Sequence, residues 1–422
     1  MKKTIDKFFL ISFLIFFGTR AFLLLNPAAE YIGRPTRRGY SDVTHFYEPY
    51  ANMWRYGLPP YLKHMFEYPP GAVPLIYLPL IFDQIGIGFY YLNYRIQTFL
   101  IETLIFFFIL KTLKRTFSQP FSRYASVIYF AVAAIIAKDF WYEGIDIAFI
   151  GSLTLALISY LLLKKQKFIQ KTLFWFLFWL SGAIKIVTLP LWIPFLFIKN
   201  KNIKKTFKEE FNALIIGFLL VWGIPLAIFR TSLSIPFYFH AKRPLHASSF
   251  PAYIIYTINH FTKSEVMKDL EWFGVLTQKA LFWSFVGLGV FTALIIAWAI
   301  MKKLKNKKVD PYILMLRTSI LYLIAFMMSG KIISPPFHIW HTFLLTIFPY
   351  KNKKTQFILF FLGLWILIFN TTNIVKLPET IMIYPFTWQY LRHLLRFPPL
   401  ITIALLMLKN DVARKNLTGN RS

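Results

Sequence analysis

Cysteine is absent from this chain of 422 residues, so structural disulfides, thiolate metal sites and cysteine nucleophiles are all excluded. Acidic residues are scarce, with 18 Asp and Glu against 48 Lys and Arg, and the formal net charge is +30. Charged residues of both signs make up only 16% of the chain, whereas 57% is hydrophobic and the mean hydropathy is +0.52. A soluble domain of this length does not have such a composition, so we expect an integral membrane protein.

Two familiar chemical motifs are also missing. The sequence has neither the Gly-x-x-x-x-Gly-Lys-Ser/Thr loop that binds nucleotide phosphates nor the His-Glu-x-x-His motif of zinc enzymes. Asp42, His45 and Glu48 are close together, but at helical spacing Glu48 turns away from the other two, so we interpret them as polar helix surface. The sequence therefore predicts no metal site and no cofactor.

The basic residues fall in short runs between apolar segments and do not form one patch. Such runs mark the cytoplasmic ends of membrane spans, and they do not indicate a nucleic-acid partner. The runs lie at residues 2–3, 111–115, 164–171, 199–208, 302–308, 351–354 and 409–421.

Apolar segments between these runs predict an all-α polytopic bundle of about twelve transmembrane helices, with both termini in the cytoplasm. The predicted spans are 8–25, 90–110, 124–137, 147–163, 173–182, 184–198, 211–229, 281–301, 311–328, 336–349, 357–369 and 391–408. The first is expected to be a retained helix and not a signal peptide, because it is long and lacks a cleavage site. The short, proline-containing segment 71–82 is predicted to be re-entrant. We expect a single transmembrane domain, 1–422, with long external loops at 26–70 and 230–279.

The first external loop contains a helix whose two ends are marked. Ser41 is a residue type that caps helix N-termini, and Gly57 followed by Pro59 indicates the stop. At helical spacing one face is apolar and the other polar, which predicts an amphipathic helix lying on the membrane surface. The apolar face comprises Val43, Phe46, Tyr47, Tyr50, Met53 and Trp54, and the polar face Asp42, His45 and Asn52.

Asp42 is the candidate catalytic residue of this helix. It stands in the first turn, where the helix dipole favours a carboxylate. It can simply help to cap the helix, or it can act as a general base that takes the proton of an acceptor hydroxyl during group transfer. His45 can assist that base or be only a polar-face residue.

Three short motifs follow this helix start in order. They are Gly57-Leu58-Pro59-Pro60-Tyr61, Tyr68-Pro69-Pro70 and Leu78-Pro79. Together with the Ser-Asp at the helix start, this order resembles the GT-C superfamily of membrane glycosyltransferases, and most of all the bacterial family that uses polyprenyl-phosphate-mannose as donor. The resemblance implies a GT-C-like helix bundle in which Asp42 is the catalytic base, and Tyr68 is predicted to bind substrate.

Further motifs with the same resemblance lie downstream. His240 and Arg243 match the family's His-x-x-Arg stretch, with His246 where Gln is common. Lys331 and Ser334 match a Lys-x-x-Ser-Pro stretch, although Pro336-Phe337 departs from it. Lys185 lies in a segment similar to the family's Lys-x-x-Pro, whereas Glu143-Gly144-Ile145-Asp146 matches the family's Gly-Gln-x-Asn poorly. The predicted substrate-binding residues are His45, Tyr68, Lys185, His240, Arg243, His246, Lys331 and Ser334.

The chemistry of a lipid-phosphate donor gives some of these residues a role independently of the family. A departing phosphate anion needs cations in a poorly hydrated site, and Arg243 and Lys331 are candidates. Both can instead be interfacial side chains that reach toward water, and the same holds for Arg20 near the end of its helix. Lys185 lies between two short apolar helices, where a charge is a functional candidate.

These observations predict a multi-pass cell-membrane hexosyltransferase. It would transfer a sugar, expected to be mannose, from a polyprenyl-phosphate donor to a hydroxyl of a glycolipid, glycan or protein outside the cytoplasm, with inversion. A transporter or flippase of lipid-linked sugars is the alternative from a different class, although paired halves and midplane charges are not evident in the sequence. A polymerase or ligase of lipid-linked glycans is a third possibility.

Overall fold

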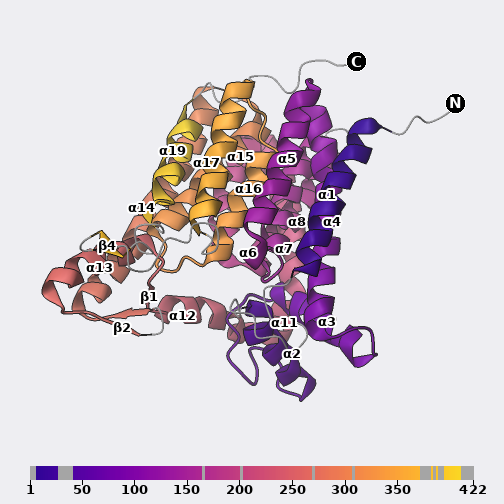
Figure 1. Ribbon diagram of the computed structural model, residues 1–422. Coiled ribbons are helices and arrows are strands. Elements are labelled where there is room, and N and C mark those ends of the chain that lie inside the picture. Colours follow the sequence, from indigo (N-terminus) through magenta and orange to yellow (C-terminus); the bar gives the residue numbers. More distant parts are fainter. Residues whose placement is uncertain are drawn as a thin grey trace. The chain divides into compact units, whose positions relative to one another are not determined.

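A computed structural model of the chain (Figure 1) describes residues 6–26, 41–163, 167–199, 203–268, 271–306, 309–370, 382–383, 386–387 and 394–409. The chain forms two compact units, which are described separately. The first unit comprises residues 1–189 and 202–241, and the second comprises residues 190–201 and 242–422.

In the described part of the first unit the regular elements are helices. It contains α1 (Lys7–Leu25), the π-helix η1 (Val43–Tyr47), α2 (Glu48–Arg55), α3 (Ala72–Gln84), α4 (Tyr90–Thr116), α5 (Pro120–Ile136), α6 (Lys138–Trp141), α7 (Asp146–Leu162), α8 (Lys167–Ile184), the start of η2 (Ile186–Leu191), α10 (Ile203–Phe218), η3 (Leu219–Gly223), α11 (Ile224–Phe229), η4 (Arg230–Ser234) and α12 (Ile235–Lys242), whose last residue belongs to the second unit. A non-helical stretch joins α2 to α3. Helix α7 packs between α4 and α8, and α1 packs along α5.

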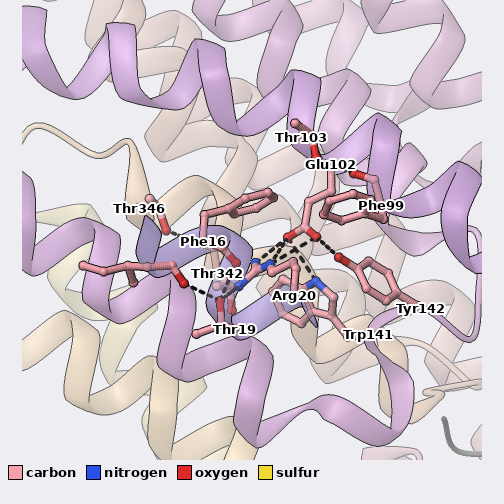
Figure 2. A network of polar contacts seen from close by, with 11 residues as sticks. Phe16, Thr19, Arg20, Phe99, Glu102, Thr103, Trp141, Tyr142, Thr342 and Thr346 are labelled. Carbon is pink, nitrogen blue, oxygen red and sulfur yellow. Dashed lines mark hydrogen bonds and ion pairs between the residues drawn. The ribbon is translucent and has the colours of Figure 1, made fainter. Parts of the chain in front are cut away.

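Helix α4 carries two buried charged residues, and these fasten the first unit together. Arg95 and Glu102 are two turns apart on this helix, and both are almost completely buried. Figure 2 shows Glu102 paired with Arg20 of α1, which reaches the carboxylate through Nε and Nη2. The same carboxylate accepts hydrogen bonds from Trp141 Nε1 at 3.0 Å and from the Tyr142 hydroxyl. The interpretation of Arg20 as a side chain that reaches toward water is therefore wrong, because its guanidinium is buried and paired with Glu102 inside the unit.

The second unit combines a helical bundle with a small β-containing region. Its elements are α9 (Trp192–Lys199), β1 (Leu245–His246), α13 (Phe250–Thr262), β2 (Val266–Lys268), β3 (Glu271–Phe273), α14 (Val275–Lys305), α15 (Pro311–Ser329), η5 (Pro335–Ile339), α16 (Trp340–Thr346), α17 (Lys353–Asn370), β4 (Met382–Ile383), β5 (Phe386–Thr387) and α19 (Phe397–Leu408). Strands β1, β3 and β2 form an antiparallel sheet in that order. Helix α15 is buried almost all round, between α14, α9 and α19.

Six helical segments of the described chain are long and apolar enough to cross a membrane. They are Lys7–Leu25, Tyr90–Thr116, Glu210–Lys242, Val275–Lys305, Pro311–Ser329 and Lys353–Asn370. Further apolar helices, such as Pro120–Ile136 and Asp146–Leu162, are shorter. The prediction of a helical membrane protein is confirmed, whereas the count of about twelve crossings and their direction stay predictions. The segment predicted to be re-entrant forms the short helix α3.

The Arg20–Glu102 pair gives a testable stability prediction. Glu102→Leu leaves the Arg20 charge buried without its carboxylate, so we expect the free energy of unfolding to fall by about 3–5 kcal/mol. The double variant Arg20→Met/Glu102→Leu removes both charges and should recover most of that loss. Thermal denaturation of the purified protein in detergent measures both effects.

The exposed pair between Lys114 and Asp6 provides the control, since its side chains are 52% and 36% accessible. Lys114→Met should change the melting temperature little, because solvent screens a surface pair. A double variant at Arg20 and Glu102 that is no more stable than Glu102→Leu would contradict the electrostatic explanation.

Candidate functional site

Asp42 stands at the start of a π-helical turn, and this turn decides where its side chain lies. Ser41 caps the turn as predicted, since its hydroxyl accepts the Val43 N–H at 3.1 Å. Asp42 makes no capping hydrogen bond, so the capping interpretation of this residue is wrong. The Glu48 N–H bonds to the Val43 carbonyl, five residues back, which is the hydrogen-bond pattern of a π turn.

The wider turn changes which residues share a face. Val43 and Tyr47 are buried, whereas Phe46, predicted for the same apolar face, is 36% exposed. Asp42 was predicted to lie opposite Tyr47, yet both side chains border the same space beside Gly144. The predicted faces assume an α-helix with 3.6 residues per turn. A π-helix has more residues per turn, so the predicted assignment of residues to faces fails over this stretch.

Gly144 identifies the space in front of the Asp42 carboxylate. A Cβ atom on Gly144 would lie 3.9 Å from Asp42 Oδ2, 3.7 Å from the Tyr47 hydroxyl oxygen and 3.0 Å from Asp146 Oδ2. Two carboxylates and a phenol therefore converge on one small volume that only a residue without a side chain leaves open. Most of Asp42 is enclosed by the protein, and only a small part of it is accessible to solvent.

Lys185 is the cation of this group. Its Nζ atom lies 2.7 Å from Asp146 Oδ1, and the pair is largely buried. Lys185 occupies the break between α8 and η2, as the sequence predicted, while Asp146 begins α7. The site thus combines an ion-paired carboxylate, Asp146, with a second carboxylate, Asp42, that faces the same space.

Glu143 fixes the turn that carries Asp42. Its carboxylate accepts a hydrogen bond from the Ser41 hydroxyl, next to Asp42, and one from the Tyr91 hydroxyl at 2.8 Å. It is also paired with Arg95 of α4, whose Nη2 donates to the Leu23 carbonyl at 2.6 Å. All of these groups are buried, and through Glu143 and Arg95 they link the turn that carries Asp42 to α4 and to the end of α1.

Burial raises the pKa of Asp42 to about 7, because the charged form loses hydration. Lys185 lowers this pKa, whereas the neighbouring carboxylates of Asp146, Glu67 and Glu143 raise it. Burial also raises the pKa of the Tyr47 and Tyr68 phenols well above the usual value, so both remain neutral hydrogen-bond donors. A carboxylate that titrates near neutrality is suited to accept and release a proton at physiological pH.

The other predicted residues of the first unit differ in how close they come to this site. The Tyr68 ring packs edge-on against the Tyr47 ring with centroids 5.6 Å apart, so Tyr68 joins the Asp42 group. His45 is exposed, and its Nδ1 lies 3.0 Å from the carbonyl oxygen of Ser41 in its own turn. His240 lies near the end of α12, half-buried. Tyr68 and Lys185 are therefore placed with Asp42, and His45 is directed back to its own backbone.

The second unit gathers the remaining predicted cations. Lys331 Nζ donates to the Arg243 carbonyl at 2.6 Å, and the His246 N–H donates to the Lys331 carbonyl at 3.0 Å. The Arg243 guanidinium lies 3.6 Å from Glu271 of β3. Lys331 is buried, so its side chain does not extend into water.

Arg396 is a fourth basic side chain of this group, and no sequence motif marks it. It donates to the Ser248 carbonyl and, at 3.0 Å, to Asn370 Oδ1, while Asn370 donates to the Pro335 carbonyl at 2.8 Å. Ser334, which precedes the η5 turn, is thereby held in the same loop network. Burial, Arg243 and Arg396 lower the pKa of His246 to about 4, and burial and Arg243 lower that of Lys331 to about 8.

Several important residues could have been found from a weak signal in the sequence. Glu143 and Asp146 are acidic residues at the start of an apolar segment, and Glu102 and Arg95 interrupt another apolar segment. A charged residue within or beside an apolar membrane segment is expected to have a functional role or a charged partner. Among the described residues, no three His, Asp or Glu side chains are placed to hold a metal ion together.

No protein-family model matches this chain, and no curated protein is significantly similar to it in sequence. The site must therefore be interpreted from its own geometry and charge.

The pKa of Asp42 can be tested without an activity assay. Hydrophobic carbodiimides modify protonated carboxyl groups, so modification of Asp42 should fall as the pH rises, with a midpoint at about pH 7. Lys185→Gln removes the cation that favours ionisation and should move the midpoint to higher pH. Asp146→Asn removes a like charge and should move it to lower pH. Mass spectrometry of the labelled peptide measures the midpoint in each variant.

The two substitutions control for each other, because both break the same Lys185–Asp146 pair. A general loosening of the site would shift both midpoints in one direction. Opposite shifts are expected only if the two charges act on Asp42 directly, and shifts of the same sign would contradict the proposed arrangement.

Proposed function

We propose that this protein is a membrane glycosyltransferase of the GT-C type, with Asp42 as its general base. The observation that carries the proposal is a carboxylate with a pKa of about 7 that faces a small space shared with Gly144, Tyr47 and the Asp146–Lys185 pair. The order of motifs in the first loop supports the same interpretation.

The reaction proposed for this site is a single displacement. Asp42 takes the proton of the acceptor hydroxyl as its oxygen attacks the anomeric carbon of the donor sugar. The bond from that carbon to the phosphate oxygen breaks, and the electron pair leaves with polyprenyl phosphate. The products are an inverted glycoside, protonated Asp42 and the lipid phosphate, and Asp42 returns its proton to water.

The polar neighbours of Asp42 suit the acceptor side of this reaction. The neutral phenol of Tyr47 can donate a hydrogen bond to the acceptor, and Lys185 keeps positive charge beside two carboxylates. Without that cation, a hydroxyl would approach two uncompensated negative charges. Gly144 leaves the space into which the hydroxyl fits.

The second unit gives independent support for a phosphate-bearing substrate. Arg243, Lys331 and Arg396 are cations gathered around a short loop, with Glu271 as the carboxylate paired to Arg243. Such a group favours an anion, and a lipid-linked sugar carries one in its phosphate. A lipid-linked donor also agrees with the lack of a nucleotide-binding motif in the sequence.

The identity of the sugar rests on the family resemblance, which favours mannose. The acceptor is proposed to be a glycolipid, glycan or protein on the extracytoplasmic side. Any of these presents a hydroxyl to the same base.

A flippase for lipid-linked sugars is a second candidate, and one observation favours it. The buried Arg20–Glu102 pair places charge inside two apolar helices, as transport proteins often do. Its partners are aromatic side chains that close around it, and this arrangement suits a structural role better.

The function is tested with membranes that contain the protein, labelled polyprenyl-phosphate-mannose and extracted lipid acceptors. We expect a new glycosidic product that requires ionised Asp42, so the rate should rise with pH through about 7. Asp42→Asn should abolish transfer, whereas Asp83→Asn, at the end of α3, should not. Transfer that survives in Asp42→Asn would refute the mechanism, and movement of carrier lipid without a new bond would favour the flippase.

Gly144→Ala tests the proposed acceptor space with one methyl group. The new Cβ would be 3.0 Å from the Asp146 carboxylate, a contact that a small side-chain shift relieves, but it would fill the space before Asp42. We expect the KM for the acceptor to rise roughly tenfold, equivalent to about 1.4 kcal/mol, with little change in melting temperature. Gly18→Ala is the control, because nothing lies within 4 Å of its Cβ position. An unchanged KM would show that the acceptor does not enter this space.

A further inference from the structure

Helix α13 of the second unit is apolar on two faces. One face packs inward, with Ala252 and Ile255 in a small core that also holds Leu245 and Trp272. The other face carries Ile254, Ile258 and Phe261, which are 51%, 37% and 73% exposed. These three follow helical spacing of four and three residues, so they form one continuous stripe. A surface helix in water would have polar residues on that stripe.

The neighbouring hairpin adds further apolar side chains to the surface. Val266 of β2 and Phe273 of β3 are directly paired across the antiparallel strands and share one face of the sheet. They are 65% and 45% exposed, and Val275, at the start of α14, is 69% exposed. We call the six residues of this surface the α13 patch: Ile254, Ile258, Phe261, Val266, Phe273 and Val275.

The patch is rigidly connected to a membrane span. Glu265, just before β2, accepts hydrogen bonds from the Leu276 and Thr277 N–H groups at 2.9 and 3.0 Å and from the Thr277 hydroxyl at 2.7 Å. These bonds cap the first turn of α14. Gly274 makes the close approach possible, since a Cβ there would lie 2.2 Å from a Glu265 oxygen. The hairpin therefore lies at the level where α14 begins.

The surface of α14 continues the apolar surface of the patch. This helix spans Val275–Lys305, and only 6% of its most apolar 18-residue stretch is buried within the protein. Phe282, Trp283 and Phe285, in the turns that follow Val275, are 61%, 65% and 50% exposed. In a membrane protein such a helix faces lipid, and aromatic residues are typical of the depth at which a span meets the headgroups.

Three exposed lysines border the patch, whereas the nearby Glu265 is buried and Glu271 is paired across the strands with Lys268. Lys263, Lys268 and Lys279 are all exposed, and they follow α13, end β2 and lie in the first turns of α14. Apolar side chains bordered by lysines are characteristic of segments that lie in the interface of an anionic bilayer. A protein partner would not need continuity with the lipid-facing surface of α14.

We propose that the α13 patch is a membrane-docking surface, inserted into the headgroup and acyl-chain boundary of the leaflet at which α14 begins, with its lysines on anionic headgroups. The small region of α13 and the β1–β3–β2 sheet is then held against the bilayer and does not extend into water. This inference is independent of the proposed enzymatic activity.

The absence of cysteine makes a direct test possible. Single variants Ile258→Cys, Phe261→Cys and Phe273→Cys are labelled with an environment-sensitive fluorophore and reconstituted into bilayers. We expect blue-shifted emission at all three positions, and strong quenching when the lipids carry bromine near the glycerol end of the acyl chains. Ser264→Cys, at the exposed turn between α13 and β2, is the control and should report water and little quenching.

Each outcome separates lipid from the alternatives. If the label in Phe261→Cys emits at wavelengths as long as those of the label in Ser264→Cys, the patch is in water. That result would overturn the proposal. Blue-shifted emission without quenching by brominated lipid would mean that protein covers the patch, which would also overturn it. Replacing anionic lipid by neutral lipid should weaken quenching, and Lys263→Gln/Lys268→Gln should remove that lipid dependence. Quenching that is equal in both lipids would overturn the placement of the lysines on anionic headgroups.

Discussion

The ion pair between Arg95 and Glu143 is the constraint on which the arrangement of the first unit's site depends. It joins a membrane helix to the loop before α7, and the same carboxylate holds Ser41, the residue before Asp42. A buried pair is expensive to desolvate, so it adds less to stability than its geometry suggests. Its role here is positional, because it brings the turn that carries Asp42 and the start of α7 to one place.

Arg20 and Glu102 repeat this arrangement two turns further along α4. Trp141 and Tyr142 bind Glu102, and Glu143, the next residue, binds Arg95. Both ion pairs thus hold residues 141–143, and this fixes the positions of Gly144 and Asp146, which follow them. These polar groups are buried and find most of their partners among one another, and this restricts the segment to one arrangement.

The sequence allowed the helical membrane class, the Ser41 cap, the Gly57 stop and the position of Lys185 to be predicted, because these follow from local composition and spacing. It did not reveal the partners of Lys185 or Arg20, since Asp146 and Glu102 are distant in sequence and pairing across helices leaves no periodic signal. The faces of the Asp42 helix were predicted wrongly where the backbone departs from α-helical geometry. Arg396 was overlooked because the chain around it carries no recognisable motif.

The π turn at Val43–Tyr47 has a consequence for how this loop can change. A π turn holds one residue more than the α-helix that surrounds it, so it behaves as a single-residue insertion preserved in the fold. Shortening the turn by that residue would rotate everything before it by about 100° relative to α2. Asp42 would then leave its space although every side chain around Gly144 stayed in place. The position of Asp42 therefore depends on the number of residues in this turn as much as on their identity. An alignment of related sequences should allow a one-residue gap here.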